Sequence, residues 1–232
     1  QGYFVYDSKK SGAKTVSHLR FGKEPIHAPY LISAADFIAC HQFNFLEKEE
    51  MLKWAKPGAT FLLNSPHAAS EVWNYLPLAV QRSILDKNIR VFVIDASEVA
   101  RATGMTGRIN TIMQTCFFAL SGVLPPDRAI AEIKKAIEKT YSKKGKAVIQ
   151  KNFEAVDQTL ENLFEVKIPA HATAPAPKGQ RIPDHAGEFV RSVTEKMMAG
   201  LGDDIPVSAL PRLHRDGEAV AFDADRNHQD IA

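Results

Sequence analysis

Two short segments of the sequence have the composition of anion-binding loops, and the first follows an apolar run near the amino terminus. It consists of Ser8, Lys9, Lys10, Ser11 and Gly12. Ligands of open α/β sheets collect at the carboxyl ends of the strands, so this segment could hold a phosphate or another anion. An ordinary solvated turn has the same composition, and that alternative stays open on the residues alone.

The second segment, residues 103–110, is a glycine-containing loop that leads into an apolar helix. Its free backbone N–H groups, the Arg108 guanidinium and the Asn110 side chain could meet an anion. The alternative is a plain connection between two helices, in which a glycine caps the first helix. The sequence does not decide between the two interpretations.

Asp95 ends the strongest predicted strand, and a strand-terminal acid can bind the hydroxyls of a ribose. The glycine fingerprint of dinucleotide-binding proteins, GxGxxG, does not occur in the sequence. The absence of this fingerprint favours the alternative, a helix-capping or loop carboxylate.

No residue is predicted to be a catalytic acid, base or nucleophile. The histidines of the amino-terminal part, which lack HxH or HExxH spacing, are His18, His27, His41 and His67. A metal site is therefore not expected. The two cysteines form no CxxC pair and cannot supply the four thiolates of an iron–sulfur cluster, and Cys116 is expected to be an inert thiol in a helix core.

A predicted sheet positions these residues. Apolar runs predict strands at residues 2–7, 15–21, 37–40, 60–64 and 90–95, with helices at 49–54 and 76–86. This order predicts an incomplete doubly wound α/β fold, with a mostly parallel sheet covered by helices on both faces. Continuous apolar runs favour strands buried on both sides, and residues 37–40 are the expected central strand.

The following part of the chain is predicted to be helical. Ser97 is placed to cap a helix that ends at Ala102, and residues 109–120 are apolar almost all round, which is typical of a buried helix. Two amphipathic helices follow, the first from Pro126, with Gly145 between them. The fold thus has a helical carboxyl-terminal half.

Composition divides the chain into three parts. Residues 1–168 form the predicted domain, residues 169–211 a proline- and alanine-rich linker with a short helix at about 186–199, and residues 212–232 a polar tail expected to be disordered. The apolar strand at residues 2–7 has no cap or turn before it. We therefore expect the chain to be a piece of a larger protein.

The near-equal numbers of basic and acidic residues limit the classes of partner that the chain is expected to bind. The 232 residues include 29 Lys and Arg against 27 Asp and Glu, so neither a nucleic acid nor a membrane is an expected partner. No stretch approaches the roughly 18 apolar residues of a membrane span. The low number of cysteines favours a reducing cytoplasm.

Three runs of sequence carry a resemblance to a known family. They are GYFVYDSKKSG at residues 2–12 with TVSHLRF at 15–21, ADFIACH at 35–41, and RINTIMQTCFF at 108–118. Over residues 1–211 the chain resembles the gamma-type domain of the pyruvate:ferredoxin (flavodoxin) oxidoreductases, in their single-chain form linked to nitrogen fixation.

The resemblance implies an enzyme that oxidatively decarboxylates pyruvate with coenzyme A to acetyl-CoA and CO2. Such an enzyme uses thiamine diphosphate with Mg²⁺ and several [4Fe-4S] clusters, passes electrons to ferredoxin or flavodoxin, and is a homodimer. The gamma-type domain packs beside the parts that hold these groups and is implicated in coenzyme A access. Residues 8–12 with Arg108 and Asn110 would then line the coenzyme A side, where Lys9, Lys10 and Arg108 would neutralise phosphates.

The chain also departs from the family pattern. The strand, glycine-rich loop and first helix that open the family's domain are not found, and we expect residues from Arg212 onward not to match the connecting domain that follows in the family. The resemblance therefore implies a segment that does not turn over pyruvate alone. Two other classes stay open, a nucleotide-binding dehydrogenase and a non-catalytic domain that only packs within a large assembly.

Overall fold

The computed structural model describes residues 1–6, 15–142, 145–175, 182–183, 185–198 and 201–210. The chain divides into two compact units, Gln1–Ala176 and Pro177–Ala232. Each unit is described by itself below. No helix among the described residues is long and apolar enough to cross a membrane.

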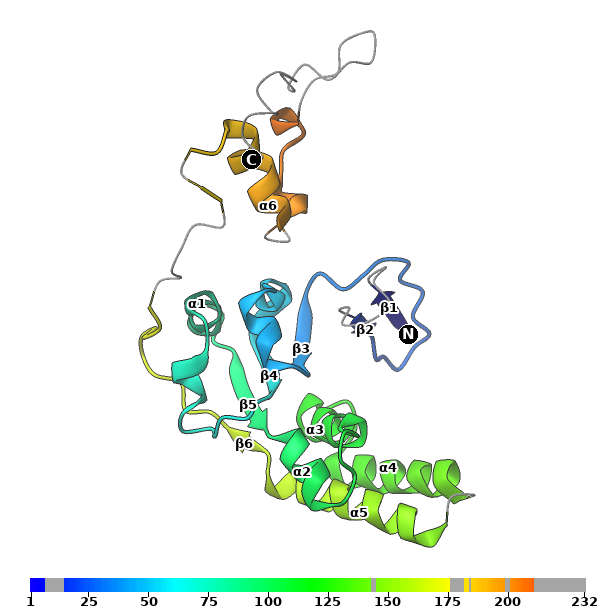
Figure 1. Cartoon of the computed structure of the whole chain (residues 1–232). Helices are drawn as coiled ribbons and strands as arrows, with labels where there is room; N and C mark the ends of the chain where they lie inside the picture. Colours follow the sequence, from blue (N-terminus) through cyan, green and yellow to red (C-terminus); the bar gives the residue numbers. More distant parts are fainter. Residues whose placement is uncertain (7–14, 143–144, 176–181, 184, 199–200, 211–232) are drawn as a thin grey trace, which may run out of the picture. The chain divides into compact units, whose positions relative to one another are not determined.

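The first unit contains a four-stranded sheet in the order β3-β4-β5-β6 (Figure 1). Its strands are β3 (Ala35–Cys40), β4 (Ala55–Asn64), β5 (Arg90–Ile94) and β6 (Phe164–Glu165). The first three run parallel, and β6 pairs antiparallel with β5. The predicted α/β fold with a mostly parallel sheet is therefore confirmed.

The expectation that residues 37–40 form the central strand is wrong. Among the described strands β3 pairs with β4 alone and lies at the edge of its sheet, whereas β4 and β5 each have two neighbours. Burial follows this order, because Leu62 of β4 is fully buried while Ala39, its partner across the sheet, is exposed. A short apolar run predicts a strand, but its place in the sheet depends on residues far along the chain.

Side chains alternate between two cores along β4, which explains its continuous apolar run. Phe61 and Leu63 pack on one face, and Leu62 packs on the other. All three are 0% exposed. Because a strand covered on both faces has no side exposed to solvent, apolar and polar residues do not alternate along its sequence.

The first face is covered by segments that connect the parallel strands. These are η1 (Phe43–Glu47), η2 (Met51–Trp54), η3 (Val72–Tyr75) and α1 (Leu78–Asp86). The buried side chains of Trp73, Leu76 and Ile84 pack here on the strand residues. The predicted helix at residues 49–54 is only a 3₁₀ turn from Met51, because β4 already begins at Ala55. Pro77 is the N-cap residue of α1.

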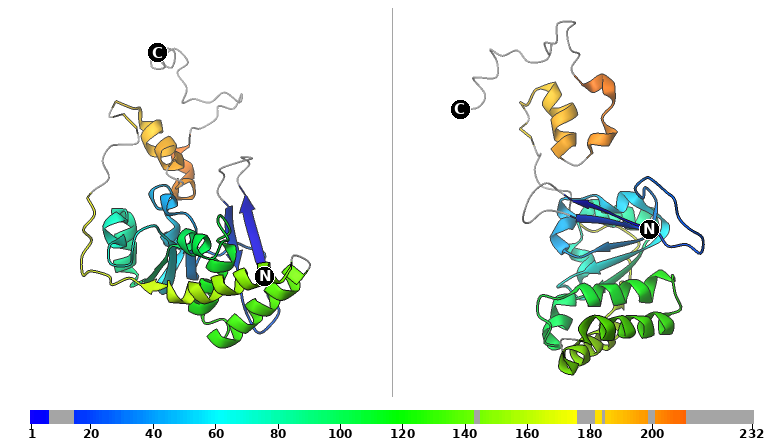
Figure 2. Two further views of the ribbon diagram at one scale, coloured as in Figure 1. Left: turned by 60° about the horizontal axis from the view of Figure 1, so that its bottom comes forward. Right: turned by 90° about the vertical axis from the view of Figure 1, so that its right-hand side faces the viewer.

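Four helices lie together on the side of the sheet opposite α1 (Figures 1 and 2). The second face is covered by α2 (Ala96–Ala102), α3 (Asn110–Ser121) and α5 (Lys146–Glu161), and α4 (Pro126–Tyr141) packs on α3 and α5. Ile112, Met113 and Cys116 of α3 pack here with Ala155 of α5. The predicted buried helix at residues 109–120 and the two amphipathic helices after it are confirmed.

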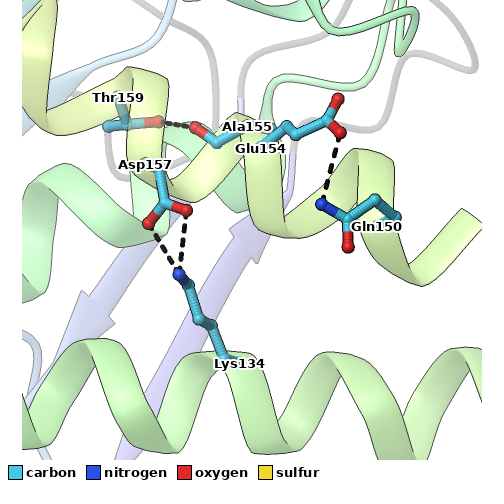
Figure 3. Close-up of polar contacts among 6 residues, drawn as sticks. All are labelled: Lys134, Gln150, Glu154, Ala155, Asp157 and Thr159. Atoms are coloured by element: carbon cyan, nitrogen blue, oxygen red, sulfur yellow. Dashed lines mark hydrogen bonds and ion pairs between the residues drawn. The ribbon is translucent and has the colours of Figure 1, made fainter.

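Helices α4 and α5 form a pair that is joined by apolar packing and one ion pair (Figure 3). Ile133, Ile137 and Val156 form a small buried cluster between them. The Lys134 ammonium donates to both carboxylate oxygens of Asp157, at 2.6 and 2.9 Å. The chain turns into α5 at Gly145, whose φ of 92° is strained for any residue with a side chain.

The amino-terminal strands do not belong to the main sheet. β1 (Gly2–Tyr6) and β2 (Thr15–Leu19) pair antiparallel as a separate two-stranded sheet. The expectation of a buried first strand is wrong, because Phe4 is 57% and Val5 41% exposed. Strand type could be predicted from these apolar residues, but burial needs covering elements, which no described segment supplies here.

The second unit contains a short helical segment where the sequence predicts a helix at about 186–199. It consists of one π-helical turn, η5 (Val190–Thr194), followed by α6 (Glu195–Met198), and Val193 is its buried residue. Two 3₁₀ turns follow, η6 (Gly202–Asp204) and η7 (Val207–Ala209). The predicted disordered tail at residues 212–232 lies outside the described residues.

Candidate functional site

Parallel strands bring several polar residues to one edge of the main sheet. Asn64 at the end of β4 donates from Nδ2 to the His41 carbonyl at 3.0 Å and accepts from the Ala96 N–H at 2.9 Å. His41 follows β3 and Ala96 follows β5, so one carboxamide joins the ends of all three parallel strands. This edge is where open α/β sheets hold their ligands.

Asp95 lies at this edge and caps α2. Its Oδ1 accepts a hydrogen bond from the Glu98 N–H at 2.8 Å, which satisfies one of the free donors of the first helical turn. The expectation that Ser97 caps this helix is therefore wrong, since the helix begins one residue after Asp95. The helix-capping interpretation of Asp95 is confirmed.

A cavity of about 520 Å³ opens beside Asp95, between the ends of β4 and β5. Its walls come from residues 65–70 after β4, from the end of β5 with the first turn of α2, and from the chain before β6. Apolar walls include Val93, Val99 and Phe164. This volume lies within the range of small-molecule sites, about 300–1,000 Å³.

His67 belongs to an aromatic group beside this cavity. Its ring stacks on Tyr75 with 3.6 Å between centroids and 5° between planes, and it meets the edge of Phe43 at 5.2 Å. The loop that carries it is held by Ser65, whose hydroxyl accepts from the His67 N–H at 3.0 Å and donates to the His67 carbonyl at 3.2 Å. In the described part of the chain no three His, Cys, Asp or Glu residues gather as a metal site would require.

The loop at residues 103–110 leaves α2 through a glycine cap. Gly104 has a φ of 68°, its N–H donates to the Arg101 carbonyl at 3.1 Å, and the Met105 N–H donates to the Ala100 carbonyl at 2.6 Å. These two bonds form a Schellman motif. The glycine-cap interpretation is therefore confirmed, and it leaves the exposed surface of the loop available for another role.

Arg108 and Asn110 lie on that exposed surface. Asn110 is the first residue of the 12-residue helix α3, whose N-cap side chain makes no capping bond and whose first turn has no acidic residue. No described carboxylate pairs with Arg108. The predicted partners Ser8, Lys9, Lys10, Ser11 and Gly12 lie outside the described residues, so their meeting with Arg108 stays a prediction.

Lys151 of α5 is a further cation at this loop that sequence reasoning missed. Its Nζ lies 3.1 Å from the point where a Cβ on Gly104 would stand, so the ammonium packs closely against this glycine. No described carboxylate pairs with Lys151 either. The sequence does not distinguish Lys151 from the other exposed charged residues of α5. Its position at the loop results from a tertiary contact between α5 and the loop.

Both thiols are buried, on opposite faces of the sheet. Cys40 belongs to the core on the α1 side and Cys116 to the core under α3. Burial raises the pKa of Cys40 to about 11 and that of Cys116 to about 12. Both thiols therefore stay protonated near neutral pH and are poor nucleophiles.

Comparison with known families gives two matches along the chain. The model described as "Pyruvate ferredoxin/flavodoxin oxidoreductase" matches residues 1–162. A second model, EKR, described as a domain of unknown function, matches residues 176–221.

Several curated proteins are similar to nearly the whole chain. It is 60% identical over 215 residues to the pyruvate-flavodoxin oxidoreductase of Rhodospirillum rubrum and 48% identical over 211 residues to the probable pyruvate-flavodoxin oxidoreductase of Escherichia coli. It is 46% identical over 210 residues to the pyruvate:ferredoxin oxidoreductase of Moorella thermoacetica. These alignments cover 90–91% of this chain but 18% of each relative. The chain thus spans about a fifth of their length.

A solved structure shares the fold. The PORC subunit of pyruvate oxidoreductase from Thermotoga maritima superposes with a TM-score of 0.52 at 18% identity, covering 72% of this chain and 81% of that subunit. At this identity the match concerns the fold alone. It agrees with the mixed α/β architecture and helical carboxyl-terminal half described above.

Proposed function

The chain belongs to the pyruvate ferredoxin/flavodoxin oxidoreductase family, and on this premise we propose that it forms the coenzyme A side of a pyruvate-oxidising enzyme. The whole enzyme would convert pyruvate and coenzyme A to acetyl-CoA and CO2 and pass electrons to ferredoxin or flavodoxin. The names of the long relatives support this reaction. The chain contributes binding surface to it and does not turn over pyruvate alone.

The cofactors of the proposed reaction belong to the whole enzyme. Thiamine diphosphate with Mg²⁺ would supply the decarboxylation chemistry, and [4Fe-4S] clusters would carry the electrons. The donor set of this chain does not fit a cluster, because its two cysteines are buried on opposite faces of the sheet and a cluster needs four thiolates. The role proposed for the chain is therefore anion binding and packing.

One observation supports the coenzyme A role above the others. Arg108 is exposed on the glycine-bearing loop that leads into α3, Lys151 lies against Gly104 of the same loop, and no described carboxylate neutralises either. Coenzyme A carries several phosphate charges, and guanidinium and ammonium groups are their usual protein partners. Asn110 would donate a neutral hydrogen bond, and Ser8–Gly12, which follow β1 in the sequence, would complete the site.

Titration of the 232-residue chain with coenzyme A, followed calorimetrically at low salt, tests this role. Arg108→Ala and Lys151→Ala should each weaken binding about 3- to 20-fold, which is the loss of one charge-assisted contact at a partly screened site. Lys139→Ala, an exposed lysine in the last turn of α4, is the matched control and should leave affinity unchanged. Equal affinity in all three variants would contradict the proposal.

A second arm separates phosphate recognition from general attraction. Pantetheine lacks the nucleotide phosphates, so its weaker binding should not respond to Arg108→Ala or Lys151→Ala. In a full-length relative, the variants that match Lys9→Ala plus Lys10→Ala should raise the apparent KM for coenzyme A. An unchanged KM there would favour a packing role instead.

A non-catalytic packing role is the second candidate, and one observation favours it. Phe4, Phe21 and Tyr30 are 57%, 51% and 66% exposed around the separate two-stranded sheet. Large exposed apolar side chains gathered in one region are typical of interfaces. The two candidates are compatible, since one surface could pack within the enzyme while another meets coenzyme A.

Two wider expectations complete the proposal. The whole enzyme would be a homodimer and would work in the cytoplasm, where a reducing environment keeps thiols and clusters intact. Light scattering on a full-length relative measures the first. Fractionation of cells that express a tagged full-length relative measures the second.

A further inference from the structure

The cavity at the ends of β4 and β5 differs from the cationic loop around Arg108 in the charge of its side chains. Its polar lining residues are Ser65, His67, Ser70, Asp95, Glu98 and Asn162. The charged members are both carboxylates, and no lysine or arginine lines it. A site for phosphate or carboxylate ligands needs the opposite arrangement.

The hydrogen bonds already made by these residues determine what they can still offer. Asn162 donates from Nδ2 to the Gln158 carbonyl at 2.8 Å, which leaves its Oδ1 as an acceptor. The Ser65 hydroxyl has its proton committed to the His67 carbonyl at 3.2 Å. For a ligand, Asn162 therefore keeps Oδ1 and one N–H, and the Ser65 hydroxyl keeps acceptor capacity alone.

The carboxylates of Asp95 and Glu98 add negative charge to the cavity lining. Asp95 is half-buried, and its Oδ1 accepts from the Glu98 N–H while no described residue bonds to Oδ2. Glu98 uses Oε2 for an exposed ion pair with Arg101, and such surface pairs hold little free energy. A ligand that donates hydrogen bonds and carries positive charge would meet both groups.

The remaining walls suit an apolar body. Val93, Val99 and Phe164 line the cavity together with His67, whose ring stacks on Tyr75. A cation next to aromatic faces gains further electrostatic attraction. We propose that this cavity is a binding site for a small organic cation, an ammonium or guanidinium group carried on an apolar or aromatic body. The site is independent of the coenzyme A contact proposed above.

The test uses a pair of small probes that differ mainly in the sign of charge. Phenethylamine, protonated at pH 7, and 3-phenylpropanoate are titrated into the 232-residue chain, with backbone amide shifts followed by NMR. The cation should bind at least about tenfold more tightly, with shifts centred on residues 65–70, 93–99 and 162–164. Equal affinities, or shifts centred elsewhere, would overturn the proposal.

Two charge-removing variants keep the test independent of folding. Asp95→Asn retains a good N-cap acceptor and Glu98→Gln changes an exposed side chain, so both should fold. Each variant should weaken the binding of the cation about two- to tenfold. The affinity for 3-phenylpropanoate should stay the same or rise slightly. Glu138→Gln on α4, away from the cavity lining, is the control and should change neither affinity. Unchanged cation affinity in the Asp95→Asn plus Glu98→Gln double variant would also overturn the proposal.

Discussion

The side-chain oxygen of Gln81 accepts a hydrogen bond from the backbone N–H of Thr173 at 2.7 Å. The same oxygen accepts a second bond from the Ala174 N–H at 3.0 Å, and Nε2 donates to the Trp73 carbonyl at 2.7 Å. Gln81 is 0% exposed, so a single buried carboxamide ties the segment after β6 to α1 and to the turn before it. The end of the first unit is thus held by a contact 92 residues distant in sequence.

Gln81→Ala should destabilise the first unit by about 1–3 kcal/mol, because it leaves the buried Trp73 carbonyl and two part-buried N–H donors without their bonds to Gln81. Urea denaturation measures the loss, and hydrogen exchange at Thr173 and Ala174 should accelerate. Gln150→Ala is the matched control, since Gln150 is exposed and bonds only to Glu154 (Figure 3), and its effect should stay within about 0.5 kcal/mol. Equal stabilities of the two variants would show that the buried contact does not hold the segment.

Gly104→Ala and Gly107→Ala should cost similar stability but differ in their effect on anion binding. Both glycines have positive φ, 68° and 77°, which an alanine adopts at a cost of about 1–2 kcal/mol. A Cβ on Gly104 would also lie 3.1 Å from the Lys151 ammonium and force it to shift, whereas a Cβ on Gly107 meets nothing within 4 Å. Coenzyme A affinity should therefore fall in Gly104→Ala and hold in Gly107→Ala, and an equal fall in both would contradict the role of Lys151.

The buried thiols should make the protein less stable as the pH rises above about 9. Burial raises the pKa of Cys40 to about 11 and of Cys116 to about 12, from an ordinary value of 9.0. The folded state then holds protons that the unfolded chain has released, so the stabilising contribution is complete below pH 9 and decreases as the pH rises. The slope is up to about 1.4 kcal/mol per pH unit for each thiol.

The measurement for this prediction is urea denaturation between pH 7 and 10.5. Lysines and tyrosines titrate in the same range, so the wild-type profile is compared with that of Cys40→Ala plus Cys116→Ala. The double variant should be less stable at pH 7 but should show a shallower decline. Parallel profiles would mean that the thiols do not contribute.

His18 should weaken the amino-terminal two-stranded sheet when the pH falls. Burial, and then the charge of Arg20, lower the pKa of His18 below 6.5, and its Nδ1 accepts a hydrogen bond from the Ile32 N–H at 3.1 Å. The unfolded chain takes up the proton first, so this contribution is complete above about pH 6.5 and is lost as the pH falls through the folded pKa. Protonation at Nδ1 also removes the acceptor.

Hydrogen exchange at the Ile32 amide, corrected for intrinsic rates, measures this effect between pH 7.5 and 5. Its protection should decrease over that range, while protection of β4 and β5 amides stays constant. His27→Gln is the control, because His27 is exposed and has no such bond to a backbone amide among the described contacts. Constant protection of Ile32 at pH 5 would contradict the prediction.

Local sequence patterns were sufficient to predict whether most elements are helices or strands. The continuous apolar run of residues 90–94 predicts a strand buried on both sides, and Val91, Val93 and Ile94 are at most 2% exposed. The 3.6-residue periodicity of α4 and α5 and the apolar surface of α3 likewise predict their helices. Whole-segment likeness in residues 2–21, 35–41 and 108–118 indicated the family, because each run preserves many residues in order.

Only the tertiary structure decided which elements meet. An apolar run states that a strand is buried but not which strands pair with it, so β3 could lie at the edge and β1 outside the sheet without any change in their local patterns. The same reason hides the contact of Lys151 with Gly104 and the bond of Gln81 to Thr173. The sequence by itself determined strand and helix types and family membership, whereas long-range packing determined where their polar side chains converge.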